Sequence, residues 1–197
     1  MKGYVIILLL FCGDNFNGKN TTATNTVAMI PADTILSDDP DLQLVNGICY
    51  YRCGPFSGYV KEEYDAHVLK RMSSYLHGLL EGSTSIYYPN GQIWQERWYH
   101  ENKCNGTHRG WWENGLKKFE FHYCMDKREG EFKQWYRSGA KYTYLHFKND
   151  VEDGMQQAWR ENGKLYLNYE VKNGARYGLQ KSALCYTLVN EKIKKYK

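Results

Sequence analysis

Residues 111–116 read Trp-Trp-Glu-Asn-Gly-Leu, and a close variant, Trp-Arg-Glu-Asn-Gly-Lys, occupies residues 159–164. Asn-Gly between two segments of strand-forming residues is a strong signal for a β-hairpin, because both residues tolerate a positive φ. After the first of these turns, Phe119, Phe121 and Tyr123 alternate with charged or polar residues, which is typical of a strand with one buried face. The stretch therefore predicts an antiparallel hairpin.

Glycines recur around this hairpin with a constant period of 24 residues. One column contains Gly58, Gly82, Gly106, Gly130, Gly154 and Gly178, and the other contains Gly91, Gly115, Gly139 and Gly163, with His67 in the corresponding place of the first repeat. A fixed period of this length is the signature of a repeat protein in which each unit packs on its neighbours. We expect an all-β fold, an elongated antiparallel sheet of tandem 24-residue β-hairpin repeats.

The chain divides into four segments. In residues 1–12 a lysine precedes an apolar run, which is typical of a signal peptide, and Leu9-Leu10-Phe11-Cys12 resembles a lipobox that would make Cys12 a lipidation site. Ordinary cleavage or a retained apolar tail is the alternative. Residues 13–44 have the composition of a flexible linker, residues 45–190 form the repeats with atypical capping units at both ends, and residues 191–197 are a basic tail.

These segments predict an exported protein, either a lipoprotein of the cell envelope or a secreted protein. If the apolar N-terminus is not a signal, the protein is cytoplasmic.

Composition and motifs argue against several classes of function. The net charge of +4 comes from 26 basic and 22 acidic residues, a balance that does not favour nucleic-acid binding. The sequence contains no motif that pairs a nucleophile with a general base and no phosphate-binding glycine loop. It also lacks the spacing of Cys and His residues that is typical of metal sites. We expect a protein that is not an enzyme and has no cofactor, no metal site and no evident small-molecule substrate.

Two cysteines are candidates for a disulfide bond. If Trp112 pairs with Leu116 across the turn, the same register places Cys104 directly opposite Cys124, and a two-residue loop would place them diagonally. Free thiols in a reducing compartment are the alternative. A bond between Cys49 and Cys53 could close a second, smaller loop.

Aromatic columns supply the candidate binding surface. Trp111, Trp135 and Trp159 occupy one column, which is either a packing layer or a stripe for a partner, since Trp and Tyr dominate interface hot spots. Other aromatic residues are spaced an even number of positions from polar residues of the same strand, so they should lie on the polar face. These stronger candidates for exposed rings are Trp94, Trp98, Tyr142 and Tyr144. The face on which the Trp111 column lies depends on the type of turn.

The strings Tyr-Tyr-Pro-Asn-Gly-Gln at 87–92 and Trp-Trp-Glu-Asn-Gly-Leu at 111–116 resemble MORN-repeat variants, in particular those of bacterial YwqK-type antitoxin components. The resemblance covers about residues 45–189. It implies a non-enzymatic hairpin-repeat protein that works by binding another protein.

The expected function is therefore a protein–protein interaction module or scaffold, with an antitoxin-like component as one form of it. Two alternatives remain open. One is a membrane-associated module held by Cys12 or by the basic tail from Lys192 to Lys197, and the other is a glycan-binding surface protein.

Overall fold

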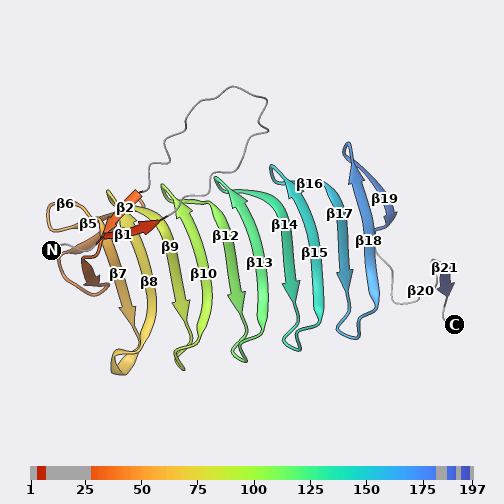
Figure 1. Ribbon diagram of the computed structural model, residues 1–197, viewed down its shortest axis with the longest axis horizontal. Coiled ribbons are helices and arrows are strands. Elements are labelled where there is room, and N and C mark those ends of the chain that lie inside the picture. Colours follow the sequence, from red (N-terminus) through yellow and green to blue (C-terminus); the bar gives the residue numbers. More distant parts are fainter. Residues whose placement is uncertain (1–3, 8–27, 181–185, 190–191, 196–197) are drawn as a thin grey trace. The chain divides into compact units, whose positions relative to one another are not determined.

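The computed structural model describes residues 4–7, 28–180, 186–189 and 192–195, which belong to two compact units. Unit 1 runs to Gly106 and includes the tip Cys124–Asp126, and unit 2 contains Thr107–Tyr123 and the chain from Lys127 onward. Every regular element in these ranges is a strand except one 3-10 turn, η1 (Asp65–His67) (Figure 1). The predicted all-β class is confirmed. None of the helical structure in the described ranges has the length and hydrophobicity needed to cross a bilayer.

The main sheet of unit 1 follows the chain order from β7 to β10, with successive strands antiparallel. A short strand, β3, adds to the outer edge of β7 in parallel, and β11 pairs with β10. The strands are β3 (Thr34–Leu36), β7 (Gly58–Glu63), β8 (Leu69–Leu76), β9 (Leu79–Tyr87), β10 (Ile93–His100) and β11 (Lys103–Cys104). Two of the predicted repeats therefore form hairpins in this unit.

The predicted flexible linker is wrong for residues 28–44, because this stretch contains strands. β2 (Ala28–Pro31) pairs with β1 (Tyr4–Ile7), and Ile30 is fully buried. β4 (Leu42–Val45), β5 (Ile48–Tyr51) and β6 (Gly54–Pro55) form a separate antiparallel sheet, which we call the cap. These strands have too few residues to show a hydrophobic period against their polar surroundings. Residues 13–27 and Cys12 lie outside the described residues.

Unit 2 repeats the antiparallel pattern from β12 to β19. Its strands are β12 (Gly106–Trp111, shared with unit 1 at Gly106), β13 (Lys117–Cys124), β14 (Lys127–Trp135), β15 (Lys141–Lys148), β16 (Val151–Glu152), β17 (Gly154–Trp159), β18 (Leu165–Lys172) and β19 (Ala175–Leu179). β20 (Tyr186–Val189) pairs with β21 (Lys192–Lys195), so part of the predicted basic tail forms a strand. Tandem antiparallel hairpins are therefore present in each unit.

The turns at the second glycine column, Asn-Gly or Ser-Gly in sequence, are called hairpin turns, and they take the first of the two forms that the sequence left open. Trp112 N donates to the Leu116 carbonyl at 2.8 Å, and Gly115 N donates to the Trp112 carbonyl at 2.8 Å. Of the three residues between Trp112 and Leu116, only Gly115 has a positive φ, as is typical of a type I turn followed by a bulged glycine. The pairing of Trp112 with Leu116 is thus confirmed, and the two-residue loop is wrong.

A second set of turns, which we call junction turns, joins one hairpin to the next. They are two-residue turns with positive φ at both positions, namely His77-Gly78, Glu101-Asn102, Met125-Asp126, Asn149-Asp150 and Asn173-Gly174. In three of them the second side chain accepts a hydrogen bond from a backbone N–H of the preceding hairpin, at 2.7 Å from Leu80 to Asn102, 2.7 Å from Cys104 to Asp126 and 2.9 Å from Arg128 to Asp150. Junction turns therefore tie neighbouring hairpins together at the end of the strands opposite the hairpin turns.

The core lies on one face of the strands. In unit 2, Phe121 stacks on Phe132 at 4.7 Å between ring centroids, and Phe132 meets Phe147 edge to face at 5.1 Å. Gly110 lies beneath Phe119, where a Cβ atom would overlap the ring. In unit 1 the corresponding columns bury polar residues instead, namely Ser73, Thr84 and Gln95. The two units therefore have similar backbones but different core chemistry.

Candidate functional site

A ring or a cation covers the partner strand beside each hairpin turn. The pairs are Tyr88–Trp94 at 5.8 Å, Trp112–Lys118 at 4.4 Å, Tyr136–Tyr142 at 4.9 Å and Arg160–Tyr166 at 5.7 Å. The first member also hydrogen-bonds to the next hairpin in unit 2, since Trp112 Nε1 donates to the Trp135 carbonyl at 3.2 Å and Tyr136 Oη donates to the Trp159 carbonyl at 2.9 Å. Trp94 and Tyr142 were predicted as exposed rings, and Tyr142 is exposed while Trp94 is half-buried. Both take part in hairpin packing.

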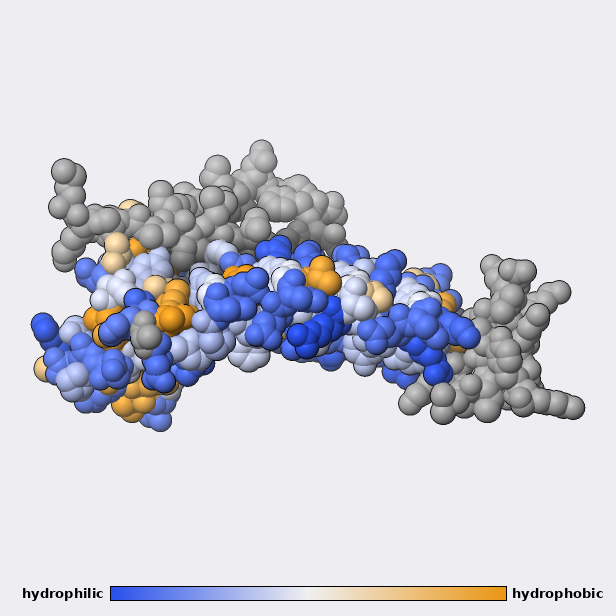
Figure 2. All heavy atoms as spheres, turned by 90° about the horizontal axis from the view of Figure 1, so that it is seen from below, coloured by the Kyte–Doolittle hydropathy of each residue, from blue (hydrophilic) through white to orange (hydrophobic). Residues whose placement is uncertain are grey.

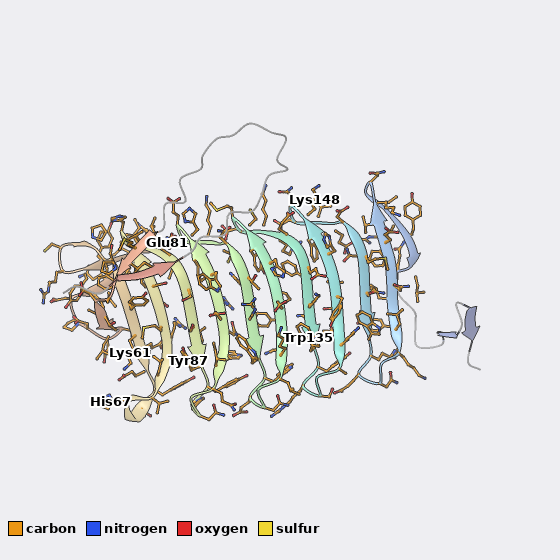
Figure 3. All side chains as sticks on the ribbon, in the orientation of Figure 1. Lys61, His67, Glu81, Tyr87, Trp135 and Lys148 are labelled. Atoms are coloured by element: carbon orange, nitrogen blue, oxygen red, sulfur yellow. The ribbon has the colours of Figure 1, made fainter. Side chains whose placement is uncertain are left out.

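Three other predicted rings form one continuous contact in unit 2. Tyr144 lies between Trp135 at 5.8 Å and Trp159 at 5.3 Å, in edge-to-face geometry on both sides. All three rings are half-buried. Trp135 lies near the hairpin-turn end of the strands (Figure 3). Half-buried Trp and Tyr rings leave part of their apolar area available for contact with another molecule.

Alternation along the strands decides which face carries these rings, and a one-residue shift in register adds Lys141 to that face. Lys133 lies opposite Tyr144, but beyond Gln134 the pairing slips, so that Trp135 lies opposite Lys141. The same shift occurs before Trp159. Trp135 lies two residues after Lys133, and Trp159 lies two residues after Gln157, which also lies opposite Tyr144. Alternation along each strand therefore places both tryptophans on the face of Tyr144 and not with the core, and the shift brings Lys141 to the same face. The structure thereby settles the question of face that the sequence left open.

Lysines surround the three rings. Lys117 Nζ is 5.7 Å from the centroid of Trp135 and Lys133 Nζ is 5.6 Å from that of Tyr144, while Lys141 Nζ lies 5.1 Å from Tyr144 and 5.5 Å from Trp159. Contacts of this kind stabilise by about 0.5–1 kcal/mol at exposed sites. We call Trp135, Tyr144, Trp159, Lys117, Lys133 and Lys141 the ladder face. Sequence reasoning found its rings and missed its cations.

Carboxylates neutralise two of these cations. Lys117 pairs with Glu120 at 3.0 Å and Lys133 pairs with Glu131 at 2.5 Å, and the hydrogen bond that Lys133 donates to Glu131 raises the pKa of Lys133. Burial acts to raise the pKa of Glu120, but hydrogen bonds from Lys117 and Arg109 outweigh it and leave that pKa below its ordinary value. No carboxylate of the described residues forms an ion pair with Lys141. Lys141 is thus the uncompensated charge of the ladder face.

Arg109, Glu120 and Glu131 border the ladder face and form a polar patch, which also contains His122. His122 Nδ1 lies 3.0 Å from Thr107 Oγ1, and burial lowers the pKa of this imidazole, with Arg109 and Lys133 acting in the same direction. Glu120 and Glu131 act in the opposite direction without outweighing burial. The neutral imidazole is therefore favoured, and the charge of the patch comes from its lysines, arginine and carboxylates.

The remaining predicted rings are distributed over the two units. Trp94 and Trp98 belong to unit 1, and the half-buried Trp98 lies over Gly106, where a Cβ would come within 3.3 Å of Trp98 Cβ. Trp111 is half-buried at the end of β12 in unit 2. Of the seven predicted rings, the structure brings Trp135, Tyr144 and Trp159 into direct contact.

The predicted bond between Cys104 and Cys124 is wrong. Cys104 is a free thiol, while Cys124 is disulfide-bonded and its partner is none of the other described cysteines. Cys104 lies on β11, where its N–H donates to Asp126 Oδ1 at 2.7 Å and its carbonyl accepts from Asp126 N at 2.8 Å, so a junction turn lies opposite it. The smaller loop is also absent, because Cys49 and Cys53 are free thiols.

In the described ranges no group of three or more His, Cys, Asp or Glu side chains is placed to hold a metal ion. The ladder face carries cations and aromatic area, which suit the binding of an acidic and apolar surface. Compared with known proteins, the chain matches no family model and no curated protein. Its relation to MORN repeats stays a prediction from the sequence.

Proposed function

We propose that this chain is a non-catalytic protein-interaction module and that the ladder face of unit 2 binds a partner protein. The observation that carries the proposal is the continuous contact of Trp135, Tyr144 and Trp159, half-buried and surrounded by lysines. Large rings of this kind bury much area on binding at a small cost in side-chain entropy, which is why they dominate interface hot spots.

The charges of the ladder face indicate the chemistry of the partner. Lys117 and Lys133 already have carboxylate partners, whereas Lys141 lies over two rings and has no acidic partner in the described part of unit 2. A partner that presents a carboxylate next to an apolar side chain would pair with Lys141 and cover the rings at once. We therefore propose an acidic, apolar patch on the partner protein.

The 24-residue repeat and its resemblance to MORN variants support an interaction role, with an antitoxin-like component as one form of it. Binding to an anionic membrane or to a glycan would use the same lysines or rings. These two alternatives are separate outcomes of the experiment.

The test begins with photo-crosslinking from a position next to Trp159 in cells of the source organism, followed by purification of the captured protein and measurement of its affinity. The double substitution Tyr144→Ala and Trp159→Ala should weaken binding at least 30-fold, a typical hot-spot loss of about 2 kcal/mol. Lys141→Glu should weaken it about tenfold by charge reversal.

The matched controls leave the ladder face intact. Lys148→Glu makes the same charge change at the opposite end of β15, and Tyr177→Ala removes an exposed ring from β19. Both should bind like the parent. Equal affinity of the double variant and the parent would refute the proposal. Loss of vesicle flotation or of glycan-array binding in that variant, with protein binding unchanged, would replace it with one of the alternatives.

A further inference from the structure

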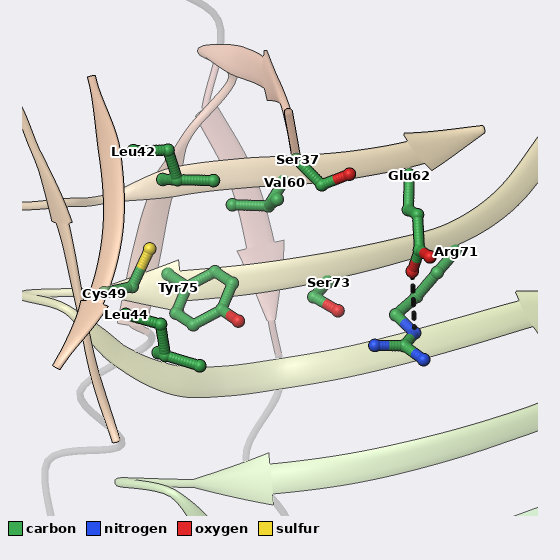
Figure 4. Close-up of a pocket in the computed structure, with 9 residues that line it drawn as sticks. All are labelled: Ser37, Leu42, Leu44, Cys49, Val60, Glu62, Arg71, Ser73 and Tyr75. Atoms are coloured by element: carbon green, nitrogen blue, oxygen red, sulfur yellow. Dashed lines mark ion pairs between the residues drawn. The ribbon is translucent and has the colours of Figure 1, made fainter. Parts of the chain in front are cut away.

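We infer that unit 1 binds a small carboxylate with an apolar body, such as a short aliphatic or aromatic acid, in a pocket between the cap and strands β7 and β8. The pocket has a volume of about 220 Å³ and is lined from both sides, by Leu42, Leu44 and Cys49 of the cap and by Val60, Arg71 and Tyr75 of the sheet, among others (Figure 4). This site is separate from the ladder face, and nothing in the proposed function requires it.

Backbone hydrogen bonds hold the cap over the sheet. Cys49 N donates to the Gly78 carbonyl at 2.8 Å, Gly78 N donates to the Phe56 carbonyl at 2.7 Å, and Phe56 N donates to the Cys49 carbonyl at 2.9 Å. Gly78 has a φ of +83°, and a Cβ there would lie 2.6 Å from Ile48 Cγ2. On the other side of the pocket Ser37 N donates to the Lys61 carbonyl at 2.8 Å. The walls of the pocket are therefore fixed without a ligand.

One end of the pocket is apolar and uncharged. Leu42 and Leu44 lie over Val60 and Tyr75, and the thiol of Cys49 is almost fully buried beside them (Figure 4). Burial raises the pKa of Cys49 and of Tyr75, which keeps both groups neutral at physiological pH.

Leu44 lines the pocket although 69% of its surface is exposed, so it forms part of the mouth. Hydrophobic surface gathers in this N-terminal part of unit 1 (Figure 2), where Met29, Leu36 and Val45 are also exposed. An apolar ligand body would cover part of this exposed area.

The other end of the pocket is polar and is lined by Glu62 and Arg71, while Lys70, outside the lining, also binds Glu62. Glu62 accepts a hydrogen bond from Lys70 at 2.6 Å and forms an ion pair with Arg71 at 3.5 Å, so two cations share one carboxylate. The ion pair of Arg71 is long, and about half of its side chain is exposed. Figure 4 shows Glu62 and Arg71 at the end away from Cys49 and Leu44. A ligand carboxylate would complete the coordination of Arg71.

Ser73 provides a hydroxyl donor in the pocket, and Thr84, outside the lining, provides a second one on the next strand. Ser73 lines the pocket and lies directly opposite Thr84 on the neighbouring strand, so both side chains occupy the same face. Thr84 is 8% exposed, and its Oγ1 has no hydrogen-bond partner among the described residues. A buried hydroxyl without a partner costs about 1–3 kcal/mol, which an accepting oxygen of a ligand would recover directly or through a water molecule.

Size and charge together define the ligand. A cavity of about 220 Å³ equals about seven water molecules at roughly 30 Å³ each, which corresponds to an organic acid of similarly few non-hydrogen atoms. The apolar end would hold its hydrocarbon body, and Arg71 with Ser73 would hold its carboxylate. A cation of the same size would meet Arg71 and find no free carboxylate in the lining, because Glu62 is already paired with Lys70 and Arg71.

The experiment titrates sodium hexanoate into the full chain, with heat and ¹H–¹⁵N NMR shifts as readouts and hexylamine as the cation of matched length. Hexanoate should saturate and shift the amides of Cys49, Ser73 and Tyr75, whereas hexylamine should not. Arg71→Gln should weaken hexanoate at least tenfold. Glu62→Gln should strengthen it, because the competing carboxylate is removed.

Two further variants keep the result interpretable. Arg137→Gln removes an exposed arginine from a hairpin turn of unit 2 and should leave hexanoate affinity unchanged. Thr84→Val preserves shape and should weaken binding even if Arg71→Gln fails to fold. Absence of saturable shifts in the parent, equal affinity in Thr84→Val, or hexylamine binding as tight as hexanoate would overturn the inference. The hexanoate titrations do not test the ladder face, because all of its residues belong to unit 2.

Discussion

The third central position of every hairpin turn requires a left-handed backbone, and one residue shows this most clearly. His67 stands where the later repeats have glycine, and it adopts a φ of +61° close to the +79° of Gly163. Tyr64 N donates to the Val68 carbonyl at 2.8 Å, as Arg160 N does to the Lys164 carbonyl at 2.8 Å. The turn therefore imposes the conformation, and glycine adopts it without the steric cost that other residues carry.

Replacing Gly163 with alanine should destabilise the protein by about 1–2 kcal/mol through backbone strain alone. No atom lies within 4 Å of the position that a Cβ would occupy there, so a clash adds nothing. Urea unfolding followed by circular dichroism measures the change in the free energy of unfolding.

Gly54→Ala is the matched control, because its Cβ also meets nothing within 4 Å and its φ lies outside the left-handed region. It should change stability by less than about 0.5 kcal/mol. Equal effects of the two substitutions would show that conformational strain is not what fixes glycine in this column.

The sequence predicted these glycine positions but not the type of turn. Asn-Gly suits both a two-residue turn and the bulged turn that forms, and the choice rests on local bonds such as Asn114 Oδ1 accepting from Leu116 N at 3.2 Å. The junction turns at Glu101-Asn102 and Met125-Asp126 gave a weak signal, since Glu101 and Met125 are not residues expected at positive φ.

At the scale of elements, each hairpin in unit 2 is tied to the next by a side chain beside its turn. Tyr136 Oη donates to the Trp159 carbonyl at 2.9 Å, and Trp112 Nε1 makes the equivalent bond to the Trp135 carbonyl. In unit 1, Tyr64 Oη donates to the Tyr87 carbonyl at 3.0 Å. Because the acceptor is a backbone carbonyl of the column that contains the ladder tryptophans, this bond also helps to position Trp135 and Trp159.

Tyr136→Phe should therefore lower the free energy of unfolding by about 1 kcal/mol, since it deletes one hydrogen bond and leaves a part-buried carbonyl without its donor. The ring contact with Tyr142 is retained, so the loss isolates the hydroxyl. Chemical denaturation of both proteins gives the difference.

Tyr177→Phe removes a hydroxyl from a tyrosine that is 60% exposed and should have no measurable effect. If Tyr136→Phe were equally neutral, the bond between neighbouring hairpins would contribute nothing to stability. A loss of partner binding in Tyr136→Phe without a loss of stability would instead mark it as a positioning residue for the ladder face.

The strands of the repeats were predictable because their alternation is long, as in Phe119, Phe121 and Tyr123. The strands β2, β3 and β4 were not, because segments of three or four residues between prolines and aspartates show no period. The candidate sites were predictable only in part. The place of Lys141 beside Trp135 depends on a one-residue register shift, and the pocket exists because the cap folds back over β7 and β8.

At the scale of the whole molecule, the constant 24-residue spacing gives successive hairpins the same strand pairing at equivalent positions. Gly130 and Gly154 have φ values of +76° and +77° and lie opposite Phe147 and Val171, equivalent residues of successive repeats. In repeat proteins of this kind, stability is approximately a sum of terms within units and between nearest neighbours. Removal of one whole period should therefore keep the alternation of buried and exposed residues, whereas removal of any odd number should reverse it.

Deletion of residues 131–154 joins Gly130 to Met155, so Gly130 takes the place of Gly154 and all later residues keep their face. The shortened protein should retain a β-type circular dichroism spectrum and one cooperative urea transition at a lower midpoint, because one interface between hairpins is lost. Deletion of residues 131–153 differs by a single residue, yet it moves every later side chain to the opposite face and exposes the positions of Ala158 and Val171. The second protein should show no cooperative transition, and similar unfolding curves for the two deletions would mean that the 24-residue phase does not specify the fold.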